Sequence, residues 1–204
     1  MSVETVMARI AEINGLLAPP RAQPPAQPVQ TTFGTVLDQA TATAGPAGAA
    51  PLGWMPGGGG AGQKMLAAAQ AEVGQAEQPP GSNDSPRIAE YRSATAGSGV
   101  GPWCAYFVSW AAQQAGSPIG EQGQGFGAVA AVWDWGQRTG RTLPAGSTPQ
   151  PGDIIVWDGR HIGIVESVGT DGSIHTIEGN SSDQVSRRTY GADGGGVTGY
   201  VRLG

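Results

Sequence analysis

The spacing of apolar residues changes near Pro144, and this change limits the fold more than any other feature of the chain. Before Pro144 the apolar residues recur at helical spacing, and after it they alternate with period two, as in strands. Helices are expected at 63–73, 86–96, 102–115 and 127–139, and strands near 153–157, 161–168, 173–180, 186–190 and 197–202. Helices followed by a run of strands are typical of an α+β domain with an antiparallel sheet.

The first part of the chain differs in composition from the rest. Residues 18–62 contain eight prolines, nine glycines and only two charged residues, which is typical of a disordered linker. Apolar residues between Val3 and Leu17 recur at helical spacing, which predicts a short amphipathic helix. We therefore expect three parts: an N-terminal helix over 1–17, a linker over 18–62 and a domain over 63–204.

Cys104 is the only cysteine of the chain and falls in the first turn of the helix predicted over 102–115, with Pro102 at its first position. Free N–H groups and the helix dipole favour a thiolate there. A cysteine nucleophile and a small buried core residue are equally good interpretations of this position taken alone.

His161 favours the catalytic interpretation. Asp158-Gly159 predicts a tight two-residue hairpin before the strand that His161 begins. A second turn at 169–172 leads into the next strand, and the expected antiparallel register places His161 opposite Glu178 to Asn180. A carboxylate or carboxamide beside an imidazole holds a general base in the correct tautomer. His175 is expected on the opposite face of its strand from Glu178, as a structural or surface residue.

Four segments resemble the CHAP domain, the cysteine- and histidine-dependent amidohydrolases/peptidases of the papain-like clan, related to the NlpC/P60 peptidases. They are Pro102–Trp110, Pro151–Trp157, His161–Val165 and Ile177–Ser181, in the order in which the family has them. The resemblance covers about residues 64–204. It implies a papain-like α+β fold, with N-terminal helices packed on an antiparallel β-sheet.

The resemblance also implies roles for individual residues. Cys104 is then the nucleophile, His161 the base, Glu178 the group that orients His161, and Asn180 a group that polarises or supports the site. Backbone N–H groups at the start of the Cys104 helix are expected to stabilise the oxyanion. Trp103 and Trp157 are candidates for contact with substrate, with core packing as the alternative for each.

No metal and no cofactor are expected. Some relatives bind calcium through acidic residues ahead of the cysteine, and the candidates here would be Asn83, Asp84 and Glu90. Their spacing lacks the pattern of a calcium loop.

The implied function is hydrolysis of a peptidoglycan amide bond through a thioester, as an endopeptidase or an N-acetylmuramoyl-L-alanine amidase. One alternative is an amidase acting on a small thiol–polyamine conjugate. Another is a catalytically weak binding or assembly module associated with the flagellum. The first two interpretations require a reactive Cys104, and the third does not.

The composition limits partners and location. The formal net charge of −5, without a basic stripe, argues against nucleic acid and anionic membranes as partners. No stretch reaches the ~20 apolar residues of a membrane span, and the N-terminus lacks a secretory signal pattern. Helix 2–17 is expected to bind a protein partner. It weakly resembles a helix of actinobacterial proteins encoded with flagellar genes. We expect a bacterial protein that acts at the cell wall after non-classical, flagellar-type export, or otherwise stays cytoplasmic.

Overall fold

The computed structural model describes residues 60–204, and the N-terminal helix and most of the linker expected over 1–62 lie outside the described residues. The described part contains four helices and six strands. The helices are α3 (Ala61–Ala71), α4 (Pro86–Ser93), α5 (Cys104–Gln114) and α6 (Val129–Arg138). The strands are β1 (Thr142–Pro144), β2 (Ile154–Trp157), β3 (His161–Val168), β4 (Ile174–Glu178), β5 (Ser186–Tyr190) and β6 (Gly199–Val201).

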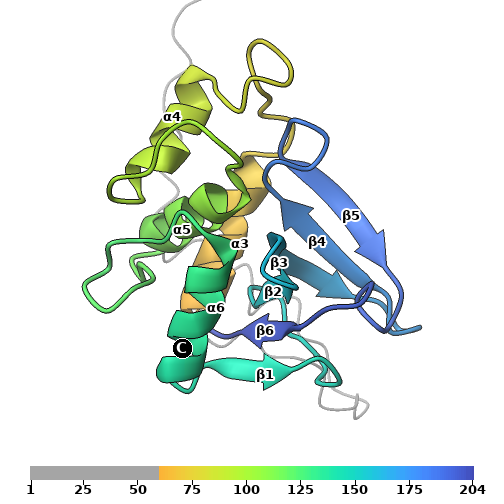
Figure 1. Cartoon of the computed structure of the whole chain (residues 1–204). Helices are drawn as coiled ribbons and strands as arrows, with labels where there is room; N and C mark the ends of the chain where they lie inside the picture. The colour runs from red at the N-terminus through yellow and green to blue at the C-terminus, as the bar shows by residue number, and fades with distance from the viewer. Residues whose placement is uncertain (1–59) are drawn as a thin grey trace, which may run out of the picture. The chain divides into compact units, whose positions relative to one another are not determined.

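The strands form one antiparallel sheet in the order β1-β6-β2-β3-β4-β5. The helices gather on one side of the sheet, as Figure 1 shows. Helix α5 contacts α3, α4, α6 and β3, so it is the central helix of the domain. The predicted α+β class, with helices packed on an antiparallel sheet, is confirmed.

Two apolar clusters hold these layers together. The larger lies between helices and sheet and contains eight of the nine buried residues of α5, together with Ile162, Ile164 and Ile177. The smaller contains the residues that alternate with these on the sheet, among them Ile155 and Val165. Period-two alternation in β2, β3 and β4 therefore places apolar residues on both faces of the sheet.

Three local predictions were wrong in detail. Helix α5 begins at Cys104 with Trp103 as N-cap, so Pro102 lies outside the first turn. The β2–β3 connection has three residues, because Trp157 pairs directly with His161. Helix α3 begins at Ala61, inside the segment expected to be linker, and the Ala61 N–H donates to the carbonyl of Gly204. Strand β1 was not expected. It is short and ends in a proline, so it carries no period-two signal.

Candidate active site

Cys104 is the first residue of α5, and its side chain lies at the edge of the main core with the residue 5% exposed. The N-cap Trp103 supplies a backbone carbonyl, which accepts from the N–H of Phe107 at 3.0 Å, but no side-chain acceptor. The N–H groups ahead of Phe107 in this turn therefore have no capping side chain. A thiol beside free N–H groups is the arrangement that a nucleophile and its oxyanion site require.

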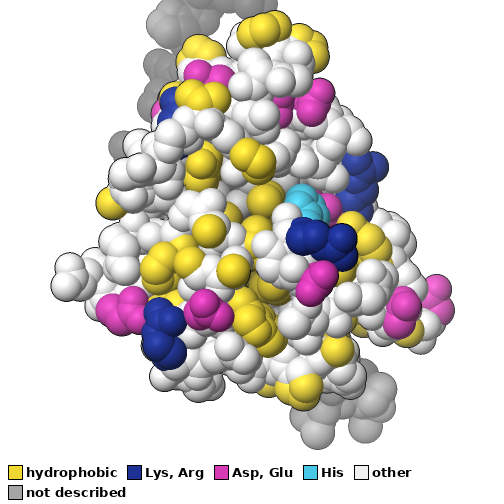
Figure 2. Space-filling model, in the orientation of Figure 1, with side chains coloured by type: hydrophobic (Ala, Val, Ile, Leu, Met, Phe, Trp, Pro, Cys, Tyr) yellow, Lys and Arg dark blue, Asp and Glu magenta, His cyan; other side chains and the backbone are white. Residues whose placement is uncertain are grey.

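His161 is the first residue of β3 and is directly bonded to Glu178. Its Nε2 lies 2.8 Å from Glu178 Oε2, and the imidazole is 29% exposed while the carboxylate is 1% exposed. The ring is therefore accessible to solvent, whereas its partner is enclosed. Figure 2 shows one histidine side chain at the surface of the face drawn there, among apolar and charged groups.

Gly163 makes room for this contact. The ladder pair Ile164–Ile177 places Glu178 opposite Gly163, one step further along the ladder. A Cβ on Gly163 would stand 2.7 Å from Glu178 Cγ, so any side chain there would displace the glutamate. The missing side chain lets Glu178 cross β3 toward His161, two residues away on the same face.

The second carboxylate oxygen of Glu178 is also fully bonded. Glu178 Oε1 accepts from Thr176 Oγ1 at 2.6 Å and from the Tyr190 hydroxyl at 2.9 Å. Three donors on two oxygens hold the carboxylate in one orientation. The arrangement satisfies a buried charge that would otherwise destabilise the fold.

Aromatic rings enclose the imidazole. Trp157 stacks on His161 with ring centroids 5.6 Å apart and contacts Tyr190 at 5.0 Å. The Trp157 indole N–H donates to the carbonyl of Gly194 at 2.7 Å, which fixes the ring. Trp157 is half-buried beside His161, so its predicted contact with substrate stays a prediction.

The charges of this cluster support one another. Burial lowers the pKa of His161, but the interactions with Cys104 and Glu178 outweigh it and raise the pKa to about 9. Burial raises the pKa of Glu178, but the bonds from His161, Thr176 and Tyr190 outweigh it and bring the pKa below its usual value. The interaction with Cys104 shows that the thiol and the imidazole are neighbours. Since Glu178 occupies Nε2, the other ring nitrogen, Nδ1, is the one left for the thiol.

These shifts imply a pH dependence of stability. The His161 contribution is complete below the ordinary histidine value of 6.5 and is lost as the pH rises through about 9. The Glu178 contribution is present above the ordinary value of 4.5 and is lost as the pH falls through the lowered pKa.

Gly179 lets the end of β4 approach the start of α5. A Cβ at this position would lie 2.6 Å from Phe107 Cβ and 3.0 Å from the ring of Trp103. The residue that follows Glu178 therefore packs directly against the turn that carries Cys104.

Asn180 lies outside β4, although the strand was expected over 173–180. Strand β4 ends at Glu178, and Asn180 has a positive φ of 55°, so strand alternation does not place it beside Glu178. Its side chain makes no hydrogen bond to His161 within the described residues. Its supporting role stays a prediction.

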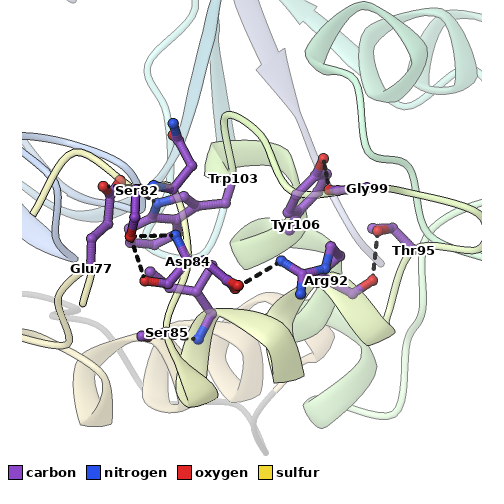
Figure 3. A network of polar contacts seen from close by, with 11 residues as sticks. Glu77, Ser82, Asp84, Ser85, Arg92, Thr95, Gly99, Trp103 and Tyr106 are labelled. Atoms are coloured by element: carbon purple, nitrogen blue, oxygen red, sulfur yellow. Dashed lines mark hydrogen bonds and ion pairs between the residues drawn. The ribbon is translucent and has the colours of Figure 1, made fainter. Parts of the chain in front are cut away.

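Trp103 was expected either to contact substrate or to pack in the core, and the structure gives the second result. The residue is 0% exposed and packs against Tyr91. Its indole N–H donates to Glu77 Oε1 at 2.9 Å, and Glu77 Oε2 accepts from the backbone N–H of Asn83 at 2.8 Å. Figure 3 shows this polar network beside the start of α5. Glu77, itself 3% exposed, thus anchors the residue that precedes Cys104.

The remaining candidates lie apart from the site. His175 is on the other side of β4 from Glu178, with Nδ1 3.0 Å from Thr189 Oγ1. Asp84 pairs with Arg92, and Glu90 pairs with Arg87. Between residues 60 and 204 no three His, Cys, Asp or Glu side chains are grouped to hold a metal ion. In that same range no helix has the length and apolar character of a membrane span.

Sequence reasoning missed several residues that shape this site. Thr176 was recoverable, because it lies two positions before Glu178 on the same face of β4. Tyr190 was not, because its ladder partner is Ile174 and only the length of its side chain carries the hydroxyl to Glu178. Glu77 lies 26 residues before Trp103, and no sequence pattern links the two.

The pKa of His161 gives a first test. In a titration followed by NMR, the His161 ring signals should change with a midpoint near pH 9. Cys104→Ala and Glu178→Gln should each move the midpoint downward, because each removes an interaction that favours the imidazolium. His175 touches neither group, and its signals serve as the internal reference. A midpoint unchanged in both variants would contradict the described contacts.

Tyr190→Phe gives a second test, because it removes one donor from the buried Glu178 carboxylate. We expect the free energy of unfolding to fall by about 1–3 kcal/mol, measured by urea denaturation at pH 7. The midpoint of the His161 titration should also shift. Tyr106→Phe removes a comparable hydroxyl, bonded to the carbonyl of Gly99, and should leave the His161 midpoint in place. Equal effects of the two variants on His161 would count against the role of Tyr190.

The comparison with protein families agrees with the motifs. Residues 95–180 match the CHAP domain, and this range contains Cys104, His161, Glu178 and Asn180. The predicted resemblance to this family is therefore confirmed. No curated protein matches the chain. Among solved structures, the peptidoglycan hydrolase RipB from Mycobacterium tuberculosis is similar, with 15% sequence identity and a TM-score of 0.45. That alignment covers 88% of this chain and 91% of the other.

Proposed function

Since residues 95–180 match the CHAP domain, we propose that this protein is a cysteine-dependent hydrolase of an amide bond in peptidoglycan. The observation that carries the proposal is the position of His161, between the Cys104 thiol and the buried Glu178 carboxylate. A nucleophile, a base and an orienting group in contact are the parts that acyl transfer from an amide requires.

In the proposed mechanism, the thiol proton moves to His161 Nδ1, and the Cys104 thiolate attacks the carbonyl carbon of the amide. The N–H groups at the start of α5 stabilise the oxyanion. The imidazolium then gives its proton to the leaving amine, and a thioester to Cys104 remains. Neutral His161 accepts a proton from water, whose oxygen attacks the thioester and releases the acid and the thiol. Glu178 keeps the ring oriented and stabilises its charged form throughout.

The bond cut decides between two activities of this site. An endopeptidase cuts within the peptide, and an N-acetylmuramoyl-L-alanine amidase cuts between sugar and peptide. Digestion of purified sacculi, followed by mass spectrometry, distinguishes them. New N-terminal amines on peptides that keep their sugars indicate an endopeptidase, and free stem peptides indicate an amidase. Intact sacculi after prolonged digestion would contradict the proposed substrate.

A small thiol–polyamine conjugate is the second candidate substrate, because the same thiol chemistry cleaves its amide. It is supported if such a conjugate is hydrolysed while sacculi and soluble muropeptides are not. A catalytically weak binding module is the third candidate, and it is supported if Cys104 fails to react with iodoacetamide at neutral pH.

The segment 1–59 carries one sequence pattern that bears on function, the apolar stripe near its N-terminus. We propose that the apolar stripe between Val3 and Leu17 binds a protein partner and directs the enzyme to the bacterial cell wall, by a flagellar-type route. A chain lacking residues 1–59 should keep its rate on soluble muropeptides and lose its wall location, as cell fractionation measures. Loss of activity on soluble substrate would contradict a purely targeting role.

A further inference from the structure

Arg188 differs from every other arginine of residues 60–204 in its partners. Six of the others pair with carboxylates: Arg87, Arg92, Arg138, Arg160, Arg187 and Arg202. Arg141 instead lies over the ring of Trp135. The exposed Arg188 guanidinium bonds only neutral hydroxyls, those of Ser181 and Ser182. Its positive charge is therefore uncompensated within the described part of the chain.

Arg188 lies on the same side of the sheet as the Glu178 cluster. Its ladder partner on β4 is Thr176, whose hydroxyl donates to Glu178 Oε1. Directly opposite residues of an antiparallel pair point to the same face. Tyr190, the other hydroxyl donor to Glu178, is two residues further along β5, a rise of about 7 Å. Residues two apart on a strand share a face, so Arg188 and Tyr190 lie on the same side of β5.

Arg187, the preceding residue, provides a built-in contrast. Its ladder partner is Ile177, which belongs to the core on the helix side. Its Nε lies 2.9–3.0 Å from both oxygens of Glu166, so its charge is neutralised. The two adjacent arginines thus point to opposite faces of the sheet. The charge of Arg187 is neutralised by Glu166, and the charge of Arg188 has no carboxylate partner within the described residues.

The loop after β4 holds Arg188 in place. Arg188 Nε donates to Ser181 Oγ at 2.8 Å, and Nη2 donates to Ser182 Oγ at 2.7 Å. The Ser181 carbonyl accepts from Ser186 Oγ, so the loop is itself tied to β5. Ser182 has a φ of 60°, which serine seldom adopts and which the surrounding contacts must hold. Two of the five guanidinium N–H groups are used in these bonds, and three stay available.

We propose that Arg188 binds a free carboxylate of the substrate, close to the bond that Cys104 attacks. A guanidinium fixed through two donors, with three others available, fits the geometry of a carboxylate. The site therefore selects an acidic peptide over its amidated form. This inference rests on the proposed hydrolase function, because it places Arg188 at the substrate site of that reaction.

Binding to the full-length Cys104→Ala protein tests this selection without turnover. The two probes are a disaccharide-tripeptide muropeptide and the same molecule with its peptide carboxylates amidated, titrated by calorimetry at pH 7 and low salt. We expect the free acid to bind about tenfold more tightly, the scale of one charged hydrogen-bonded contact. Adding Arg188→Gln should remove this preference, and adding Arg188→Lys should keep part of it, because lysine has the charge without the planar fork.

Arg187→Gln in the same Cys104→Ala background is the matched control, because it removes an adjacent charge from the opposite face. It should leave the tenfold preference unchanged. The proposal is overturned if the preference survives Arg188→Gln, if Arg187→Gln removes it equally, or if neither probe binds to the Cys104→Ala protein.

Hydrolysis by the wild-type chain separates this inference from the proposed function. Arg188→Gln should raise KM for the free acid about tenfold with kcat unchanged. The lost contact stabilises the bound substrate and the transition state equally. Hydrolysis of both probes with equal kcat/KM by the wild type would refute the role of Arg188 and leave the hydrolase intact. Failure to digest sacculi as well as both probes would refute the proposed function, while the binding titration still decides on Arg188.

Discussion

Cys104→Ala should abolish hydrolysis of peptidoglycan while the fold stays intact. The substitution removes the atom that forms the thioester, and losses of at least about a thousandfold are usual when a nucleophile is removed. The structural change is small, because one sulfur is lost at the edge of the core. Release of soluble fragments from sacculi measures the activity, and far-UV circular dichroism with thermal melting measures the fold.

The expected change in melting temperature is no more than about 4 °C, which corresponds to about 1 kcal/mol for a domain of this size. Cys104→Ser is the matched variant, because it nearly keeps the volume and replaces the thiol by a hydroxyl, a much weaker nucleophile. If either variant kept a tenth or more of the wild-type rate, Cys104 would not be the nucleophile.

Substitution of His161 should be as damaging as substitution of Cys104, because nucleophile and base act as one unit. His161→Ala also leaves the buried Glu178 carboxylate with only the donors Thr176 and Tyr190, so some loss of stability is expected. His161→Gln retains an N–H donor for Glu178 and separates the two effects. Its activity should be as low as that of His161→Ala, with a melting temperature closer to the wild type.

His175→Ala is the control for this experiment. His175 lies on the opposite side of β4 and contacts Thr189, so its loss should leave the rate on sacculi within about twofold of the wild type. A large loss of activity in His175→Ala, together with retained activity in His161→Gln, would mean that His175 and not His161 is the base.

The sequence was sufficient to predict the strands around the site. Alternation of apolar residues defined β3 to its exact bounds, and the turns on either side predicted a register with His161 opposite Glu178 to Asn180. In the structure Glu178 lies opposite Gly163, and its side chain bonds His161. The single cysteine, at a predicted helix start, left Cys104 as the one candidate for a cysteine nucleophile. Local signals of this kind, period and turn chemistry, are carried by neighbouring residues and are therefore visible in one sequence.

The details that position the site depend on close approach between distant segments. Nothing in the sequence distinguishes Gly163 and Gly179 from other glycines. In the structure Gly163 leaves space for Glu178, and Gly179 leaves space for the start of α5. Tyr190 and Glu77 reach their partners through side-chain length and the packing of whole elements. Asn180 does not have strand geometry, because β4 ends two residues earlier, at Glu178. Strand ends are set by tertiary contacts rather than by the alternation of apolar residues.

The rate at which iodoacetamide alkylates Cys104 tests the central claim most directly, because it reports the activation of the thiol by His161 without any assumption about substrate. The rate is measured at pH 6.5 by intact-protein mass spectrometry, with peptide mapping of the modified residue. We predict that the wild type reacts at least about tenfold faster than His161→Gln, since the imidazolium stabilises the attacking thiolate. Equal rates in the two proteins would contradict the account.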